Sequence, residues 1–165
     1  TSEMSDFIKA GGLGEVAAAL PRALRRRHDV RVLIPGYSAV LERALGAEIV
    51  GRIEAHAGLP ACELALIHQP DGLPVYVLLN AALFAREGSP YVSGDGVEWD
   101  DNALRFATLS HAAAQIADGN LMIDLPVAHA RGNVAFGGDE HRRPGGFQAV
   151  NDFAHIVDPA RTGVV

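Results

Sequence analysis

A lysine followed by three glycines, near the amino terminus, is the first group of residues whose types could support chemistry. Lys9 precedes Gly11, Gly12 and Gly14, and an apolar helical pattern follows these glycines. The start of a helix offers unpaired backbone N–H groups and the positive end of the helix dipole. Glycines allow an anion to approach that backbone closely, and the lysine adds a full positive charge. The stretch therefore predicts a site for a phosphate or diphosphate group, with a tight turn that binds nothing as the alternative.

The segment 12–17, Gly-Leu-Gly-Glu-Val-Ala, also fits the dinucleotide fingerprint G-x-G-x-x-G/A. Two features argue against a nicotinamide cofactor. A loop from about residue 4 to residue 11 separates the glycines from any preceding strand. The strand end near residues 30–35 also lacks the acidic residue that would hold a ribose. No cofactor is therefore expected.

A second group of polar residues lies at the start of another expected helix, residues 102–117. Asp101 and Asn102 follow a polar, glycine-containing loop with two aromatic residues, Tyr91 and Trp99. An acidic residue at a helix start can be a structural cap, because its side chain accepts from the first backbone N–H groups. The two aromatic rings can offer a stacking face for sugar rings or can pack without binding anything. The residue types alone leave both interpretations open.

The elements that must position these residues follow from the apolar periodicity of the chain. Strand-like patterns occupy residues 29–34, 49–55, 63–69 and 73–79. The strands at 49–55 and 63–69 are expected to pair as a meander, and another strand follows at 73–79. Helices are expected at residues 12–27, with a kink or break at Pro21, at 39–45 and at 102–117. The turn signal Gln-Pro-Asp-Gly at 69–72 joins the last two strands. This order predicts an α/β fold, a Rossmann-like layered and mostly parallel sheet with helices on its faces.

Composition bounds the class of protein. The 165 residues suit one domain, and a net charge of −6 disfavours nucleic acid or an anionic membrane as a partner. The single cysteine, Cys62, excludes an intrachain disulfide and fits a reduced, cytoplasmic setting. No apolar run approaches the roughly 20 residues that span a bilayer. His141 lies beside Asp139 and Glu140 without an i, i+4 pair of ligands, so no metal site is expected.

Several motifs in a fixed order resemble the amino-terminal part of bacterial glycogen synthases and plant starch synthases. They are Ser2-Glu3-Met4, Lys-Ala-Gly-Gly-Leu-Gly-Glu-Val at 9–16, Ala-Leu-Pro-Arg-Ala-Leu at 19–24, Arg-Val-Leu-Ile-Pro-Gly-Tyr at 31–37 and Asp-Asn-Ala-Leu-Arg-Phe at 101–106. The resemblance runs from residue 1 to about residue 118. It implies a retaining glucosyltransferase that uses ADP-glucose, with two Rossmann-like domains facing across a cleft, the GT-B architecture. Two departures are Ala10, where the family usually has threonine, and Glu15, where it usually has aspartate.

The resemblance also implies roles for the residues described above. Lys9 would contact the sugar nucleotide, and Gly11 and Gly12 would allow its close approach. The candidate catalytic residues, which would hold sugar hydroxyls or tune the cleft, are Glu15 and Asp101. Asn102 would lie on the substrate-binding side of the domain. The implied partners are ADP-glucose and an α-1,4-glucan, whose non-reducing end would receive the glucose.

The chain is expected to divide at about residue 118. Residues 1–118 would be a glycogen or starch synthase-like catalytic domain, and residues 119–165 a tail of weaker order with few regular apolar periods. The chain begins with threonine at the expected end of a strand, so we expect a partial enzyme whose cleft a second domain or chain completes. Such a chain should transfer little or no glucose alone. The alternative is a non-catalytic module that binds glucan or a sugar phosphate.

Overall fold

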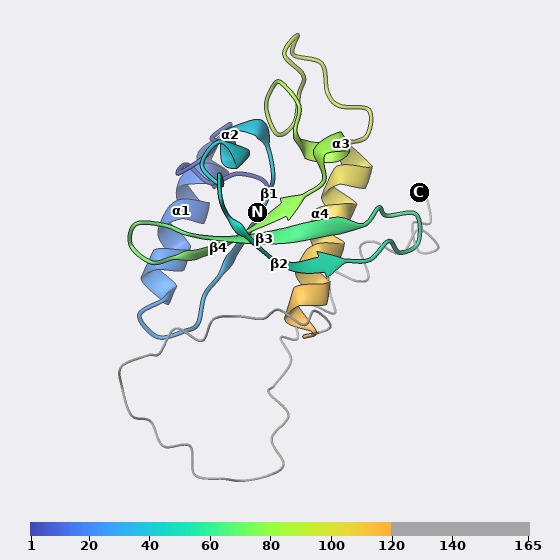
Figure 1. The fold of residues 1–165 in the computed structure, drawn as a ribbon. Coiled ribbons are helices and arrows are strands. Elements are labelled where there is room, and N and C mark those ends of the chain that lie inside the picture. The colour runs from blue at the N-terminus through green and yellow to red at the C-terminus, as the bar shows by residue number, and fades with distance from the viewer. Residues whose placement is uncertain (120–165) are drawn as a thin grey trace, which may run out of the picture.

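The computed structural model describes residues 1–119, which form a mixed α/β domain around one four-stranded sheet (Figure 1). The helices are α1 (Gly12–Leu24), α2 (Ser38–Leu41), α3 (Ala81–Phe84) and α4 (Asn102–Ala117). The strands are β1 (Val32–Pro35), β2 (Glu48–Ile53), β3 (Cys62–His68) and β4 (Pro74–Leu79), in the spatial order β1-β4-β3-β2. The predicted α/β class is therefore confirmed.

The strand directions differ from the mostly parallel sheet that the sequence predicts, and on this point the prediction is wrong for the described residues. β1 pairs parallel with β4, whereas β4 pairs antiparallel with β3, and β3 antiparallel with β2. The reason is connection length, because a parallel pair needs a crossover of about a dozen residues or more. The segments from β2 to β3 and from β3 to β4 are too short for that. β2 and β3 pair as predicted, and β4 extends this antiparallel arrangement by one strand.

The core lies around the parallel pair of strands. Ile34 in β1 and Val75, Val77 and Leu78 in β4 have no exposed surface. Continuous apolar runs of this kind are typical of parallel strands that are covered on both faces. Cys62 is buried at the start of β3.

The turn between β3 and β4 forms as predicted. Gly72 has a φ of +79°, in the left-handed region that favours glycine, and its N–H donates to the Gln69 carbonyl at 2.7 Å. The Asp71 carboxylate pairs with Arg22 of α1 at 2.6 Å, and Arg22 also pairs with Asp6 at 2.7 Å. These ion pairs connect the turn to α1 and to the loop that precedes α1. α1 continues through Pro21 but ends three residues before the predicted residue 27.

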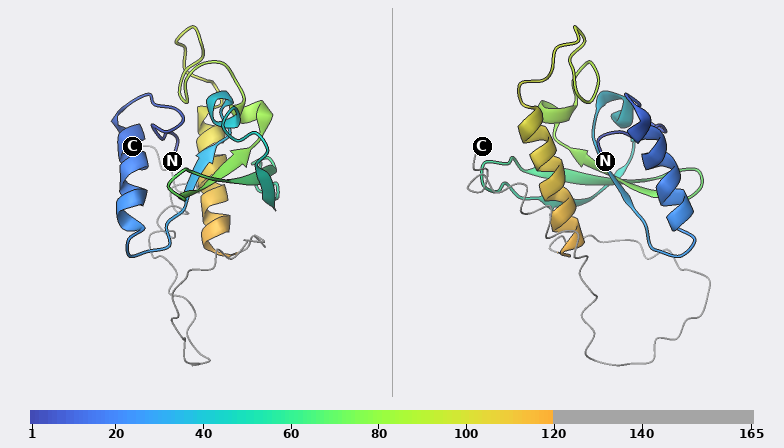
Figure 2. Two further views of the ribbon diagram at one scale, coloured as in Figure 1. Left: turned by 60° about the vertical axis from the view of Figure 1, so that its left-hand side comes forward. Right: turned by 180° about the vertical axis from the view of Figure 1, so that it is seen from behind.

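One end of the sheet gathers the elements that carry the candidate residues. Figures 1 and 2 show the start of α1, both short helices, the loop of residues 85–101 and the start of α4 at this end. α2 follows β1 and α3 follows β4, so this is the carboxyl end of the parallel pair. Ligands of open α/β sheets bind at that end. The fold thus brings both groups of candidate residues to the expected edge.

Two sequence predictions concern the rest of the chain. Within residues 1–119, no helix combines the length and the apolar character needed to cross a membrane. The tail predicted for residues 119–165 lies almost entirely outside the described residues, so its weaker order and the boundary near residue 118 stay predictions.

Candidate functional site

The glycine loop and the first turn of α1 form the first part of the candidate site. Gly11 is the last residue before α1, and Lys9 extends beside the helix start, with its Nζ 2.7 Å from Oε1 of Glu15. The Lys9 and Glu15 side chains are 52% and 62% exposed. A Cβ at Gly12 would meet no atom within 4 Å, so this glycine faces open space. A ligand can therefore reach Lys9, Glu15 and the start of α1 together.

A buried carboxylate, to which the sequence analysis assigned no role, holds this loop. Glu3 is 3% exposed, and its Oε2 accepts from the backbone N–H groups of Ala10 and Gly11, both at 2.8 Å. Its Oε1 accepts from the Tyr91 hydroxyl at 2.7 Å. Two loop N–H groups are thus bound to an internal anion. The backbone of Gly14 also hydrogen-bonds to Glu3, so the N–H groups left for an external anion at the start of α1 are those of Gly12 and Leu13.

The same hydrogen bonds fix the charge of Glu3. Burial by itself raises the pKa of a carboxyl, because it penalises the charged form. The hydrogen bonds from the Tyr91 hydroxyl and from the backbone of Gly11 and Ala10 outweigh that effect, so the pKa of Glu3 is lowered from its ordinary value. The side chain is therefore an anion at neutral pH, buried directly beneath the glycine loop.

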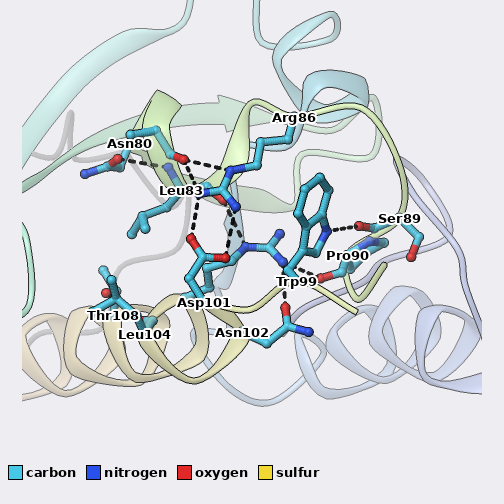
Figure 3. A network of polar contacts seen from close by, with 12 residues as sticks. Asn80, Leu83, Arg86, Ser89, Pro90, Trp99, Asp101, Asn102, Leu104 and Thr108 are labelled. Carbon is cyan, nitrogen blue, oxygen red and sulfur yellow. Dashed lines mark hydrogen bonds and ion pairs between the residues drawn. The ribbon is translucent and has the colours of Figure 1, made fainter. Parts of the chain in front are cut away.

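Asp101 is not the helix cap that one interpretation of the sequence expects. Its side chain makes no capping hydrogen bond at the start of α4. Both carboxylate oxygens instead accept from the Arg86 guanidinium, at 2.9 and 2.6 Å (Figure 3). This two-pronged hydrogen bond lowers the pKa of Asp101 although burial opposes it. The Arg86 guanidinium also lies 5.1 Å from the centre of the Trp99 ring, so Asp101, Arg86 and Trp99 form one cluster.

Arg105, one turn after the half-buried Asn102 on α4, forms the buried part of the site. Arg105 is 1% exposed and donates to the carbonyls of Leu83 and Pro90, at 2.9 and 3.0 Å. It also donates to the Asn102 side-chain oxygen at 2.7 Å. Desolvation lowers the pKa of this guanidinium. Besides Ala112, α4 buries two polar residues, Arg105 and Thr108.

Tyr91 joins the two parts of the site. Its hydroxyl bonds to Glu3 under the glycine loop, and its carbonyl accepts from the Asn102 side-chain amide at 2.9 Å. Tyr91 and Glu3 are 88 residues apart along the chain, so only the fold brings them together. Its ring lies 5.9 Å from the Phe106 ring, in tilted packing. Tyr91 therefore positions both loops relative to each other.

A pocket of about 260 Å³ lies beside these groups. Its walls include Ile8, next to Lys9, and Arg86, the partner of Asp101. Trp99, Tyr37 and Arg105 complete the aromatic and cationic part of the lining. The pocket thus lies among α2, the segment after α3 and Trp99, with Ile8 as its residue nearest in sequence to the glycine loop.

Metal ligation has no support in the described part of the chain, where no three His, Cys, Asp or Glu side chains lie close enough to hold an ion. The segment 139–141, considered above as a ligand set, lies outside the described residues. Sequence reasoning missed Glu3, Arg86 and Arg105. For Arg105, the available signal was a lone charged residue on an otherwise apolar helix face.

Comparison with known proteins decides the family. A family model described as the starch synthase catalytic domain matches residues 1–131, most of the chain. The chain belongs to the starch synthase catalytic domain family. The resemblance inferred from the motifs is confirmed, and the match to the starch synthase catalytic domain extends past residue 118.

Similar members of the starch synthase catalytic domain family are bacterial. The glycogen synthase of Xanthomonas axonopodis pv. citri (strain 306) is 64% identical over 147 residues, covering 83% of this chain and 31% of that protein. The glycogen synthase of Xanthomonas campestris pv. campestris (strain 8004) is 73% identical over 118 residues, covering 72% of this chain and 25% of that protein. The glycogen synthase of Pseudomonas paraeruginosa (strain DSM 24068 / PA7) is 52% identical over 120 residues, covering 73% of this chain and 23% of that protein. The chain thus spans less than a third of the length of these curated relatives.

Proposed function

We propose that this chain is the amino-terminal lobe of a glucan synthase that transfers glucose from ADP-glucose to the non-reducing end of an α-1,4-glucan. The observation that carries the proposal is the exposed Lys9 ammonium beside the open first turn of α1, in a member of this family. A diphosphate there would meet a full positive charge, unpaired N–H groups and the positive end of the helix dipole. Gly11 and Gly12 would let it approach the backbone.

Lys9 is available to such a ligand because its present partner holds it weakly. An exposed ion pair such as Lys9–Glu15 is worth about 0–1 kcal/mol. A hydrogen bond to a charged group is worth about 1.5–3 kcal/mol. A diphosphate can therefore displace the Glu15 carboxylate from Lys9. The freed carboxylate can then accept from a sugar hydroxyl, which is the role proposed for Glu15.

Asp101 and Asn102 would act from the other loop. The Asp101 carboxylate is bound to Arg86 but is 28% exposed, so it can accept one more hydrogen bond, from a sugar hydroxyl. Asn102 uses one side-chain N–H for the Tyr91 carbonyl, which leaves its second N–H for substrate. During transfer, positive charge develops on the glucosyl carbon and negative charge on the leaving diphosphate. Lys9 and the helix start would stabilise that negative charge.

The proposal includes a second domain or chain that faces this lobe across the cleft. In a GT-B enzyme the remaining catalytic groups come from the second domain, so this lobe alone is expected to transfer little or no glucose. We expect the cytoplasm as its setting, which the reduced, buried Cys62 supports.

A non-catalytic module that binds glucan or a sugar phosphate is the second candidate. The pocket of about 260 Å³, with Trp99 in its wall, favours it, since an aromatic wall suits a sugar ring without requiring transfer.

One experiment separates the two functions, because Lys9 is the only lysine of the chain. Reductive methylation with ¹³C labels Lys9 and the amino-terminal Thr1, and keeps the positive charge on Lys9. Loss of one signal in the Lys9→Arg variant identifies the lysine. We expect ADP-glucose and ADP to shift the Lys9 signal, and UDP-glucose to shift it less. A Lys9 signal that ignores ADP-glucose while glucan still binds would overturn the transferase proposal and favour the binding module.

A further inference from the structure

A pair of histidines joins α4 to the β2–β3 turn, residues 54–61. His56 of the turn and His111 of α4 stack their rings, with the ring centres 5.3 Å apart and the planes 11° from parallel. Aromatic rings at this separation are in packing contact. A ring nitrogen presents its lone pair in the plane of the ring, so two nearly parallel rings do not converge on one metal ion. The pair is therefore a packing contact between two titratable groups.

The β2–β3 turn that carries His56 is tight and strained. The His56 N–H donates to the Leu59 carbonyl at 3.1 Å, and the Leu59 N–H donates to the His56 carbonyl at 2.8 Å. Between these residues Ala57 has a φ of +48°, and within residues 1–119 it is the only residue other than glycine with a positive φ. Alanine adopts this left-handed conformation at a cost in free energy. Such strain persists only where surrounding contacts hold it, and the stack of His56 on His111 is one such contact.

A proton on this contact is disfavoured. The pKa of His111 is lowered from 6.5, first by burial, which penalises the charged form, and then by the charge of His56. The carboxylates on the neighbouring segments are those of Glu54, held in an exposed ion pair, Glu63 at the start of β3 and Asp118 at the end of α4. β1, on which α4 packs, has no ionisable residue. Within residues 1–119, no carboxylate offsets the lowered pKa of His111.

The direction of the pH effect follows from this lowered pKa. A released turn would return His111 to its ordinary pKa of 6.5, so the released form binds a proton more readily than the packed form. The packed form is therefore fully favoured above pH 6.5 and becomes less favoured as the pH falls through 6.5 towards the lowered value. The strain at Ala57 also favours release, so the turn opens once the stack is weakened.

We propose that the His56–His111 stack is a proton-sensitive contact that holds the β2–β3 turn on α4 at neutral pH and releases it in mildly acidic solution. The turn is also connected to α3. The Asn80 side-chain amide donates to the Ala61 carbonyl at 3.1 Å, and its oxygen accepts from the Leu83 N–H at 3.2 Å. Release of the turn would thus remove one support of the start of α3. The stack includes no residue of the proposed donor site, so the contact holds whether or not this lobe binds ADP-glucose.

Amide hydrogen exchange on the 165-residue chain tests the proposal, because the His56 and Leu59 amides are bonded within the turn. After correction for the intrinsic exchange rate, we expect their protection to fall about three- to tenfold from pH 7 to pH 5, since one pKa unit is a tenfold change in an equilibrium constant. His111→Gln removes the titrating ring and should abolish this pH dependence. The matched control is His68→Gln, which replaces an exposed histidine at the end of β3 and should retain it.

A proton NMR titration gives a second measurement, with the His111 signal identified by its loss in His111→Gln. In His56→Gln the midpoint of the His111 titration should move up towards 6.5, because the neighbouring positive charge is lost. Three results would overturn the proposal: protection of the turn that does not change with pH in the unmodified chain, a pH dependence that survives in His111→Gln, or a His111 midpoint that stays the same in His56→Gln. The exchange measurement on the unmodified chain decides the question even if a variant fails to fold.

Discussion

The buried Glu3 carboxylate should be the strongest single determinant of the glycine loop. Replacing Glu3 with glutamine keeps the shape and removes the charge. The two N–H groups of Ala10 and Gly11 would then donate to a neutral oxygen. A hydrogen bond to a charged group is worth about 1.5–3 kcal/mol and a neutral one about 0.5–1.5, so two bonds lose about 2 kcal/mol together. The bond to Tyr91 can re-form, because the glutamine N–H can donate to that hydroxyl.

Glu3→Ala should cost more, about 3–5 kcal/mol, because three donors then lose their acceptor in a buried site. That is a large share of the 5–15 kcal/mol typical of a domain. The effect should also depend on pH. The pKa of Glu3 is lower in the folded protein than its ordinary value of 4.5. Its stabilising effect is therefore fully present above pH 4.5 and is lost as the pH falls through the folded value.

Urea unfolding of the unmodified chain, Glu3→Gln and a control, at pH 7 and at pH 3, measures both effects. The control is Glu54→Gln, whose carboxylate is exposed and pairs with Arg52 at 3.1 Å. It should change stability by no more than about 0.5 kcal/mol. The reasoning fails if Glu3→Gln costs no more than the control at pH 7, or if its cost is the same at pH 3.

Three further changes test other parts of the site. Asp101→Asn should lower the free energy of unfolding by about 1–2 kcal/mol at pH 7, because it removes the charge from a partly buried ion pair with Arg86. The pKa of Asp101 is lowered from 3.8, so the loss of stability, measured by urea unfolding, should become smaller below that pH. A loss that does not depend on pH would contradict this role of Asp101. Arg105→Met should cost about 2–4 kcal/mol in the same assay, because two buried carbonyls lose their donor, and a cost below 1 kcal/mol would contradict its role. Glu15→Gln should strengthen ADP binding about two- to fivefold by calorimetry, because Lys9 loses its competing partner, and weaker binding would show that Glu15 does not compete.

Local patterns predicted the elements well. The α4 helix has the predicted bounds, and the turn at residues 69–72 forms, because helix periodicity and turn chemistry are encoded within a few residues. The relative directions of the strands were harder to predict, since the order of strands and helices favoured a mostly parallel sheet and the short connections at β2–β3–β4 override it.

The contacts of the candidate site can be foreseen from the sequence only where they are local. Lys9 and Glu15 are six residues apart and do meet, whereas Glu3 and Tyr91 are 88 residues apart, and no periodicity relates them. Asp101 was considered a cap because an acid before a helix commonly caps it. The Arg86 side chain, 15 residues earlier, offers two charge-assisted bonds and outcompetes the backbone. Only the fold shows such a partner.

The proposed function requires Lys9 and the start of α1 to bind the diphosphate of ADP-glucose. Calorimetric titration of ADP-glucose into the unmodified chain and into Lys9→Ala tests it most directly, with the exposed Arg52→Ala as the matched loss of one positive charge. We predict that Lys9→Ala weakens binding by about 1.5–3 kcal/mol while its melting temperature stays the same, and that Arg52→Ala changes neither. Equal affinities in the unmodified chain and Lys9→Ala would contradict the claim.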